Sequence, residues 1–552
     1  MSHSRACFSR PVALHQLVLA AWAAGASIAV DDSNDLASQA IRQVPKPRDL
    51  MPASHFDPRL PGKRYGPQPN HVEIASVVRQ SMPADPAQIA CASVCEQGYW
   101  LRTRQITSKR LTEIYLDRIA RIAPKLQCFI TVTAELARSQ AEQADRELRA
   151  GRDRGPLHGI AYGIKDVFDT EGIRTTWGAA PFKDRVPQQD AAVVEKLRDA
   201  GSVLLGKLST GNLAMGSAWF GGDTRNPWNV AESSGGSSAG SAAGTAAGLV
   251  AYSIGTDSLG SILNPADRCG VTGLRPTFGR VSTRGSMPLT PSLTRIGPIT
   301  RTVEDAALVL AAINGHDAEL ADSLDMGFTY DGSIDLSKLR VGYNRKWFET
   351  VALHPSARMP ASEPQRHVLN VLRDLGVQLI EVELPDLPYM ALVPLLYVEA
   401  AAVFEDLMIN GQDQQLVFGE AGPGWPDVWR QARAFSAVDY VQADRVRRLA
   451  MMAFDRLFES VDLLCGPLYG DSIELVVATN FTGHPGLTLR VGFNESPTRT
   501  IFGAVIEARA PTQRVTQNIA IHGRLFEEGK MLALARAIEE RVNVWRERPP
   551  SG

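Results

Sequence analysis

The chain has 552 residues, of which 44% are hydrophobic and 21% charged, as in an ordinary globular protein. This length allows two or three average domains, or one large α/β enzyme built around a single sheet. The net charge of −2 gives no basis for nucleic acid or an anionic membrane surface as a partner. Of the six cysteines only Cys91 and Cys95 lie close together, without a histidine at metal-ligand spacing. A metal site is therefore not indicated, and the redox compartment is left open.

The first 72 residues differ from the rest of the chain. An apolar run from Leu17 to Ala29 follows two arginines and contains Ala24-Gly25-Ala26, which fits a signal-peptide cleavage site. Residues 1–30 are therefore a signal-like segment, and both a cytoplasmic and an exported protein stay open. The Pro-rich stretch 31–72 predicts an extended arm. No other stretch reaches the ~18 uninterrupted apolar residues of a membrane span, and we expect residues 73–548 to form a single domain.

The first half of that domain alternates between helical and strand patterns. Apolar periodicity predicts a helix over Ser108–Ile122, and a charged helical stretch follows over Ala134–Gly151. The apolar run from Gly159 to Lys165 predicts a buried strand, residues Ala191–Ala200 a helix, and Ser202–Leu205 a second strand. This alternation favours an α/β fold with a largely parallel or mixed sheet.

The second half adds further elements. Thr302–Asp305 resembles a capping box and predicts the start of a helix. Strand patterns follow at Leu339–Tyr343 and Val377–Val382, and residues 390–460 have a helical pattern. A last helix is expected over Lys530–Trp545. Without an internal repeat or a clear linker, the pattern favours one domain with a helical excursion in its second half.

Residues 235–244 consist only of Gly, Ser and Ala. A flexible linker does not fit, because the apolar run Ala246–Ile254 follows at once, and a phosphate loop would need a closing Gly-Lys-Ser/Thr. Gly236–Gly240 also matches a nucleophile elbow, which would make Ser238 the nucleophile. That elbow needs a strand directly before it, whereas the pattern over Asn226–Ser233 predicts a loop. We therefore expect a small-residue loop that lets the backbone approach a ligand and a helix pack tightly on a sheet.

Several ordered motifs accompany this loop. Gly255–Ile262 ends in Gly-Ser-Ile with Ser261 24 positions after Ser237, and Cys269–Gly279 has the sequence Cys-Gly-Val-Thr-Gly-Leu-Arg-Pro-Thr-Phe-Gly. Upstream lies Gly-Ile-Lys-Asp, ending at Asp166. Together these motifs resemble the amidase-signature family, and the resemblance extends from about residue 100 to 548. It implies an α/β fold with a large mixed central sheet covered by helices on both faces.

The resemblance also implies the residues that carry the chemistry. The family's nucleophilic serine maps to Ser261, its bridging serine, held by a cis peptide, to Ser237, and its base to Lys165. Ser238 and Asp257 map to supporting positions, of which Asp257 is expected to shape the loop. The expected oxyanion hole consists of the backbone N–H groups of Ser258, Leu259, Gly260 and Ser261.

The chemistry is consistent with these residue types. A serine hydroxyl is a weak nucleophile until a base removes its proton, and a lysine can act as that base only when neutral. Burial at the end of an apolar strand favours the neutral amine of Lys165. The mechanism needs no metal, cofactor or imidazole, so His158 and His484 are expected to be structural.

Three departures from the family pattern fall near the motif. Leu259 replaces a Gly or small polar residue, Leu263 replaces a frequent Arg and is followed by Asn264, and Ala239 replaces a Gly. The two leucines put the usual contacts to the substrate in doubt.

The resulting hypothesis is an amidase that hydrolyses a carboxylic amide to an acid and ammonia or an amine through an acyl-serine. The alternatives are the glutaminase subunit of a tRNA-dependent amidotransferase and a non-catalytic binding descendant. The expected partner is a small-molecule amide rather than nucleic acid, and the oligomeric state is left open, with a homodimer among the alternatives.

Overall fold

The computed structural model describes residues 39–40, 43–44, 56–65, 69–75, 81–320, 323–349, 351–354, 357–359, 361–417, 419, 424–470, 472–500 and 511–550. The signal-like segment 1–30 and much of the arm at 31–72 lie outside these residues. Across the described part of the chain, none of the helices combines the length and the apolar character needed to cross a membrane.

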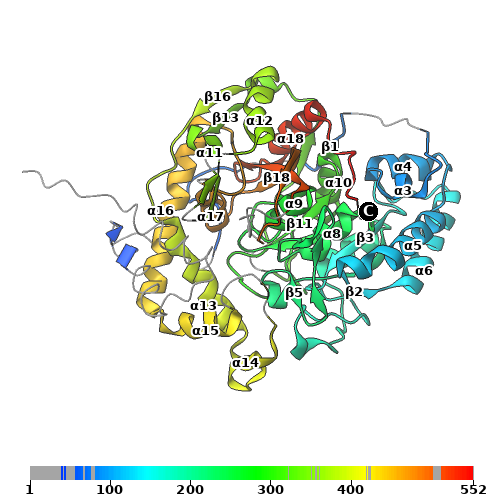
Figure 1. Ribbon diagram of the computed structural model, residues 1–552, viewed down its shortest axis with the longest axis horizontal. Helices are drawn as coiled ribbons and strands as arrows, with labels where there is room; N and C mark the ends of the chain where they lie inside the picture. The colour runs from blue at the N-terminus through cyan, green and yellow to red at the C-terminus, as the bar shows by residue number, and fades with distance from the viewer. Residues whose placement is uncertain are drawn as a thin grey trace, which may run out of the picture.

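Within the described residues, eleven strands form one mixed sheet (Figure 1). In spatial order they are β16 (Gln378–Glu381), β13 (Arg340–Tyr343), β17 (Leu463–Gly466), β19 (Gln513–Gly523), β18 (Gly486–Ser496), β10 (Thr272–Arg275), β11 (Arg295–Thr300), β9 (Tyr252–Asp257), β3 (Ala161–Lys165), β4 (Val203–Leu208) and β2 (Phe129–Val132).

The sheet has two parallel groups joined by an antiparallel centre. Strand β3 runs parallel to both β4 and β9, and β13 runs parallel to both β16 and β17. From β9 through β11, β10, β18 and β19 to β17, each neighbouring pair is antiparallel. This arrangement confirms the predicted mixed α/β sheet.

Helices surround the sheet on both faces (Figure 1). One group packs α8 (Ala239–Ala246) and α9 (Leu263–Cys269) against each other and against the centre of the sheet. Another group packs α10 (Val303–Ile313) and α12 (Glu363–Asp374) with α18 (Glu528–Val542). The described helices are α3 (Pro86–Ala90), α4 (Val94–Arg102), α5 (Ser108–Leu126), α6 (Ala134–Arg149), α7 (Ala192–Asp199), α8 (Ala239–Ala246), α9 (Leu263–Cys269), α10 (Val303–Ile313), α11 (Arg345–Glu349), α12 (Glu363–Asp374), α13 (Val393–Val403), α14 (Glu405–Ile409), α15 (Trp425–Ala434), α16 (Ala437–Ser460), α17 (Ile473–Phe481) and α18 (Glu528–Val542).

The predicted elements of both halves are present. The helix predicted over Ser108–Ile122 continues to Leu126, where Gln127 adopts φ 51° and ends it. Thr302 caps α10 by accepting a hydrogen bond from the N–H of Asp305. The stretch 390–460 contains α13 to α16, which form the helical excursion at the left of Figure 1.

One prediction is wrong. The stretch Asn226–Ser233, predicted as a loop, contains part of a β-hairpin formed by β7 (Arg225–Asn226) and β8 (Asn229–Ser233). Within the part of the chain that the structure describes, the hairpin's two strands pair with each other and not with the central sheet. They carry turn-favouring residues, which concealed them in the sequence. A strand therefore does precede the Gly/Ser loop, and the nucleophile-elbow alternative has to be judged on the side chains.

Helix α8 packs against β3, β4, β9 and β11 with an interface made of small residues. The helix lies closest to the neighbouring backbone at Gly240. A Cβ there would lie 2.3 Å from the carbonyl oxygen of Cys128 and 2.4 Å from the nitrogen of Ser209. Both are backbone atoms, which cannot move aside without disturbing the sheet. A Cβ at Gly244, one turn later, would meet only Leu208 at 3.5 Å and Phe129 at 4.0 Å.

We therefore expect opposite results from two equivalent substitutions. Gly240→Ala should lower the free energy of unfolding by about 1–3 kcal/mol through overpacking. Gly244→Ala should be neutral or stabilise the protein by up to about 1 kcal/mol, because alanine is the better helix former. Chemical denaturation of the two variants would measure this, and equal effects would contradict the assigned packing.

Candidate active site

The site lies where parallel strands end. Lys165 is the last residue of β3, and Thr256 and Asp257 are the last residues of the neighbouring strand β9. Carboxyl ends of adjacent parallel strands are where α/β proteins commonly bind ligands. Residues distant in the sequence therefore meet at the carboxyl ends of these two strands.

The amine of Lys165 is completely buried between two hydroxyl groups. Its Nζ donates to the Oγ of Ser237 at 2.8 Å and to the Oγ1 of Thr256 at 2.8 Å. Burial lowers the pKa of Lys165 to about 7, and the negative charge of Asp257 opposes part of this shift. A substantial fraction of this amine is therefore neutral at neutral pH. Thr256 was not singled out by the sequence, although it stands in the Gly-Thr-Asp motif.

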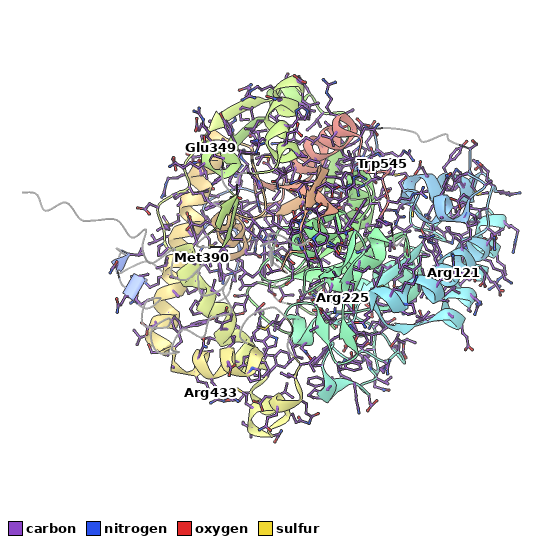
Figure 2. All side chains as sticks on the ribbon, viewed as in Figure 1. Arg121, Arg225, Glu349, Met390, Arg433 and Trp545 are labelled. Atoms are coloured by element: carbon purple, nitrogen blue, oxygen red, sulfur yellow. The ribbon has the colours of Figure 1, made fainter. Side chains whose placement is uncertain are left out.

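Ser237 follows a cis peptide bond between Gly236 and itself and is 1% exposed. The loop that carries it runs from the end of β8 to the start of α8, and Arg225 marks the hairpin that leads into it in Figure 2. A Cβ at Gly236 would lie 2.0 Å from the carbonyl oxygen of Gly216, so only glycine fits at this position. The small residues of the loop thus allow Ser237 to reach the amine of Lys165.

Asp257 organises the turn that carries Ser261. Its carboxylate accepts hydrogen bonds from the N–H groups of Gly260 at 2.7 Å, Ile262 at 2.8 Å and Leu263 at 3.3 Å. Gly260 adopts φ 87°, a backbone conformation that favours glycine. The buried guanidinium of Arg275 lies 4.0 Å from the same carboxylate. These contacts are consistent with the loop-shaping role expected for Asp257.

The predicted set of oxyanion donors needs one correction. The N–H of Gly260 already donates to Asp257 and is not directed at a ligand. Among the described residues, no protein acceptor is found for the N–H groups of Ser258, Leu259 and Ser261. The Oγ of Ser258 takes part in a buried hydroxyl cluster with Thr290 and Thr294.

Ser261 is partly exposed, and its backbone is tied to the Ser237 loop. The N–H of Ser238 donates to the carbonyl oxygen of Ser261 at 3.0 Å. The structure thus brings Lys165 and Ser237 into direct contact and places the Ser261 segment against the residue after Ser237. Among the described residues, no group of three or more His, Cys, Asp and Glu is arranged to hold a metal ion.

The environment of Ser238 does not favour a nucleophilic role. Its side chain is fully buried, and its Oγ donates to the carbonyl oxygen of Thr256 at 3.1 Å and accepts from the N–H of Thr256 at 3.2 Å. This hydroxyl therefore fastens the serine loop to β9. Because its hydroxyl is buried and bonded to β9, Ser238 does not fit the role of nucleophile in an elbow, even though a strand precedes the loop.

The side chain of Leu263 lies inside the protein. It is fully buried in a small apolar cluster with Leu468, Val476 and Ala520. Its side chain packs behind the turn, so it does not replace the contacts that an Arg at this position would make. Leu259 is partly exposed beside Ser261.

Known proteins of one enzyme family are similar to this chain. The sequence profile of the Amidase family matches residues 110–475. The chain belongs to the amidase family. The A subunit of a glutamyl-tRNA(Gln) amidotransferase from Roseiflexus sp. (strain RS-1) is 36% identical over 489 residues, which cover 81% of this chain and 95% of that protein.

Solved structures of amidases have the same fold. The native peptide amidase from Stenotrophomonas maltophilia superposes with a TM-score of 0.68 at 29% identity, covering 83% of this chain and 98% of that chain. The A subunit of a glutamyl-tRNA(Gln) amidotransferase from Thermotoga maritima, at 24% identity and a TM-score of 0.63, covers 84% of this chain and 96% of that chain and supports the fold alone. This amidase is thus a hydrolase that acts on carbon–nitrogen amide bonds.

The pKa of Lys165 predicts an acid limit to activity. A base must be neutral to accept a proton, so kcat/KM should fall as the pH drops below about 7, where Lys165 becomes protonated. Thr256→Val replaces the hydroxyl that accepts a hydrogen bond from Lys165 with a methyl group of similar shape. The loss of this acceptor disfavours the charged form of the amine. The acid limb of that variant should therefore move to lower pH.

The measurement is a pH–rate profile from about pH 5 to about pH 9, on both sides of the expected pKa, for the wild type and Thr256→Val with one amide substrate. An acid limb that Thr256→Val leaves unmoved would assign the ionisation to a group other than Lys165.

Proposed function

We propose that this amidase cleaves a small-molecule carboxamide through an acyl intermediate on Ser261, with Ser237 transferring a proton between Ser261 and Lys165. The observation that carries the proposal is the buried amine of Lys165, which lies 2.8 Å from the hydroxyl of Ser237 and has a pKa lowered to about 7. A neutral amine beside a hydroxyl can remove a proton from it, whereas an ordinary surface lysine is charged at this pH.

In the acylation step, Lys165 accepts the proton of Ser237 while Ser237 takes the proton of Ser261. The Oγ of Ser261 attacks the amide carbonyl carbon and forms a tetrahedral intermediate. The same relay then returns the proton to the departing nitrogen, which leaves as ammonia or an amine. Water, deprotonated by the same relay, hydrolyses the acyl-serine and releases the carboxylic acid.

The developing oxyanion needs hydrogen-bond donors that are already in place. The N–H groups of Ser258, Leu259 and Ser261 supply them, since they belong to one turn and have no acceptor among the described residues. Asp257 supports this function indirectly, because it holds the turn through its bonds to three other N–H groups. In other serine hydrolases the loss of one such donor costs on the order of 10²–10³ in rate.

Two serine variants test the assigned roles. Ser261→Ala should abolish covalent labelling by a fluorophosphonate probe and lower kcat by at least about a thousandfold. Ser238→Ala should keep the labelling and lose activity only in part, because it removes two hydrogen bonds to Thr256 but not the nucleophile. Intact-mass measurement of the labelled protein reports the outcome, and labelling that persists in Ser261→Ala but is lost in Ser238→Ala would transfer the nucleophilic role to Ser238.

A second candidate is the glutaminase component of a tRNA-dependent amidotransferase. The A subunits of two glutamyl-tRNA(Gln) amidotransferases are 36% and 34% identical to this chain, and the matches cover 95% and 97% of their lengths. A protein of that kind would take glutamine as its amide and would need partner chains. We favour an amidase that acts without partner chains. The protein has no net positive charge that would favour binding to nucleic acid.

A substrate panel separates these functions. The purified chain alone should release amine or ammonia from at least one aryl, fatty-acyl or peptide amide, and it should leave glutamine intact. Product release measured with the wild type and with Ser261→Ala as blank decides the question. Ammonia from glutamine but from no other amide would favour the glutaminase, and no turnover together with no labelling would favour a non-catalytic binding protein.

A further inference from the structure

The side chain of Asn264 connects the two loops that carry Ser237 and Ser261. Asn264 lies in the first turn of α9, three residues after Ser261, and is 7% exposed. Its Oδ1 accepts a hydrogen bond from the N–H of Gly236 at 2.8 Å. Its own N–H donates to the carbonyl oxygen of Gly260 at 2.7 Å, so the residue is fixed to the turn that carries Ser261.

The two peptide N–H groups that flank Ser237 therefore both donate to the segment from Ser261 to Asn264. On one side the N–H of Gly236 donates to Asn264, and on the other the N–H of Ser238 donates to the carbonyl oxygen of Ser261. Two hydrogen bonds of this kind define the position of the Ser237 backbone relative to Ser261. Ser238 makes its bond through the main chain, so Asn264 is the side chain on which the arrangement depends.

The Ser237 loop is shaped to receive this side chain. Gly235 adopts φ 76°, and a Cβ at this position would lie 2.4 Å from the Oδ1 of Asn264. A residue other than glycine would therefore collide with the atom that binds Gly236. The absence of a side chain at Gly235 provides the space that Asn264 uses.

Tyr469 fixes the orientation of the Asn264 amide. The Nδ2 of Asn264 donates to the hydroxyl of Tyr469, which directs the Oδ1 toward the N–H of Gly236. Burial raises the pKa of Tyr469, so its hydroxyl stays protonated and neutral. Tyr469 follows β17, in the other half of the sheet, and this contact links that half to the serine loop.

We infer that Asn264 is a positioning residue for the amidase reaction, which sets Ser237 against Ser261 while Tyr469 orients its amide. The inference rests on the proposed roles of Ser237 and Ser261. A displaced relay serine slows proton transfer without weakening substrate binding, because Asn264 acts on the backbone of the loop and not on the substrate. In other enzymes a misplacement of about 1 Å costs on the order of 10² in rate.

The test uses full-length variants. Asn264→Leu has a similar shape but no acceptor for Gly236, and its kcat and fluorophosphonate labelling rate should fall by at least about tenfold, with KM within about twofold of wild type. Asn264→Asp keeps an acceptor for Gly236, and its carboxylate can accept from Tyr469, so it should recover most of the labelling rate. Tyr469→Phe should show the same separation of kcat from KM at about threefold, a smaller loss because the acceptor remains.

Asn344 offers a matched control. It is 5% exposed, and its Nδ2 donates to the carbonyl oxygen of Val382 at 2.8 Å, at the edge of the sheet where β13 and β16 pair. Asn344→Leu should lower the unfolding temperature without a selective effect on kcat or on labelling.

Each outcome decides the inference. An Asn264→Leu variant with wild-type kcat and labelling, or with losses that only follow its stability as in Asn344→Leu, would overturn it. If Asn264→Leu does not fold, Asn264→Asp and Tyr469→Phe decide, and wild-type kcat in Tyr469→Phe together with no labelling in Asn264→Asp would contradict the assigned contacts. A wild-type protein that is neither labelled nor active would instead refute the proposed function itself.

Discussion

The site depends on the complete burial of one amine. Removing an ammonium group from water costs free energy, so burial favours the neutral form of Lys165 and lowers its pKa to about 7. The fold accommodates the amine by surrounding it with the hydroxyls of Ser237 and Thr256, at the end of a strand inside the sheet. Asp257 lies close enough to raise this pKa, but its carboxylate is directed at the backbone of the following turn. Burial and the charge of Asp257 together keep the pKa of Lys165 near neutral pH, where the amine can both accept and return a proton.

The close approach of the serine loop and α8 to neighbouring backbone determines the remaining geometry of the site. The hydroxyl of Ser237 can reach Lys165 only if α8 lies almost on the sheet, which requires a missing side chain at Gly240. The loop before α8 also passes close to the backbone of Gly216, which requires a missing side chain at Gly236. The composition of residues 235–244 is therefore a consequence of packing and not of flexibility. The same closeness lets the main chain of Ser238 bind that of Ser261, so that two loops from different parts of the motif become one rigid unit.

Local sequence patterns predicted the elements but not every contact. The strand ending at Lys165, the helices and the mixed sheet follow from hydrophobic periodicity and alternation, which local sequence controls. The hairpin before the serine loop was missed because its short strands carry turn-favouring residues. The hydroxyl of Thr256, the use of the Gly260 N–H by Asp257 and the packing of Leu263 behind the turn arise from tertiary contacts that spacing does not encode. A motif can identify such positions but cannot show the direction in which their polar groups point.

A second buried lysine shows why the partner of the amine matters more than its burial. Lys207 on β4 is also fully buried, and burial lowers its pKa to about 8. Its Nζ donates to the carbonyl oxygen of Phe168 and the hydroxyl of Thr175, and it lies 3.6 Å from the carboxylate of Asp166. That carboxylate and a carbonyl oxygen stabilise the charged amine, and neither links it to a nucleophile. Of these two neighbouring strands, only β3 places its lysine beside a serine loop, so two similarly perturbed amines differ in function through the groups they face.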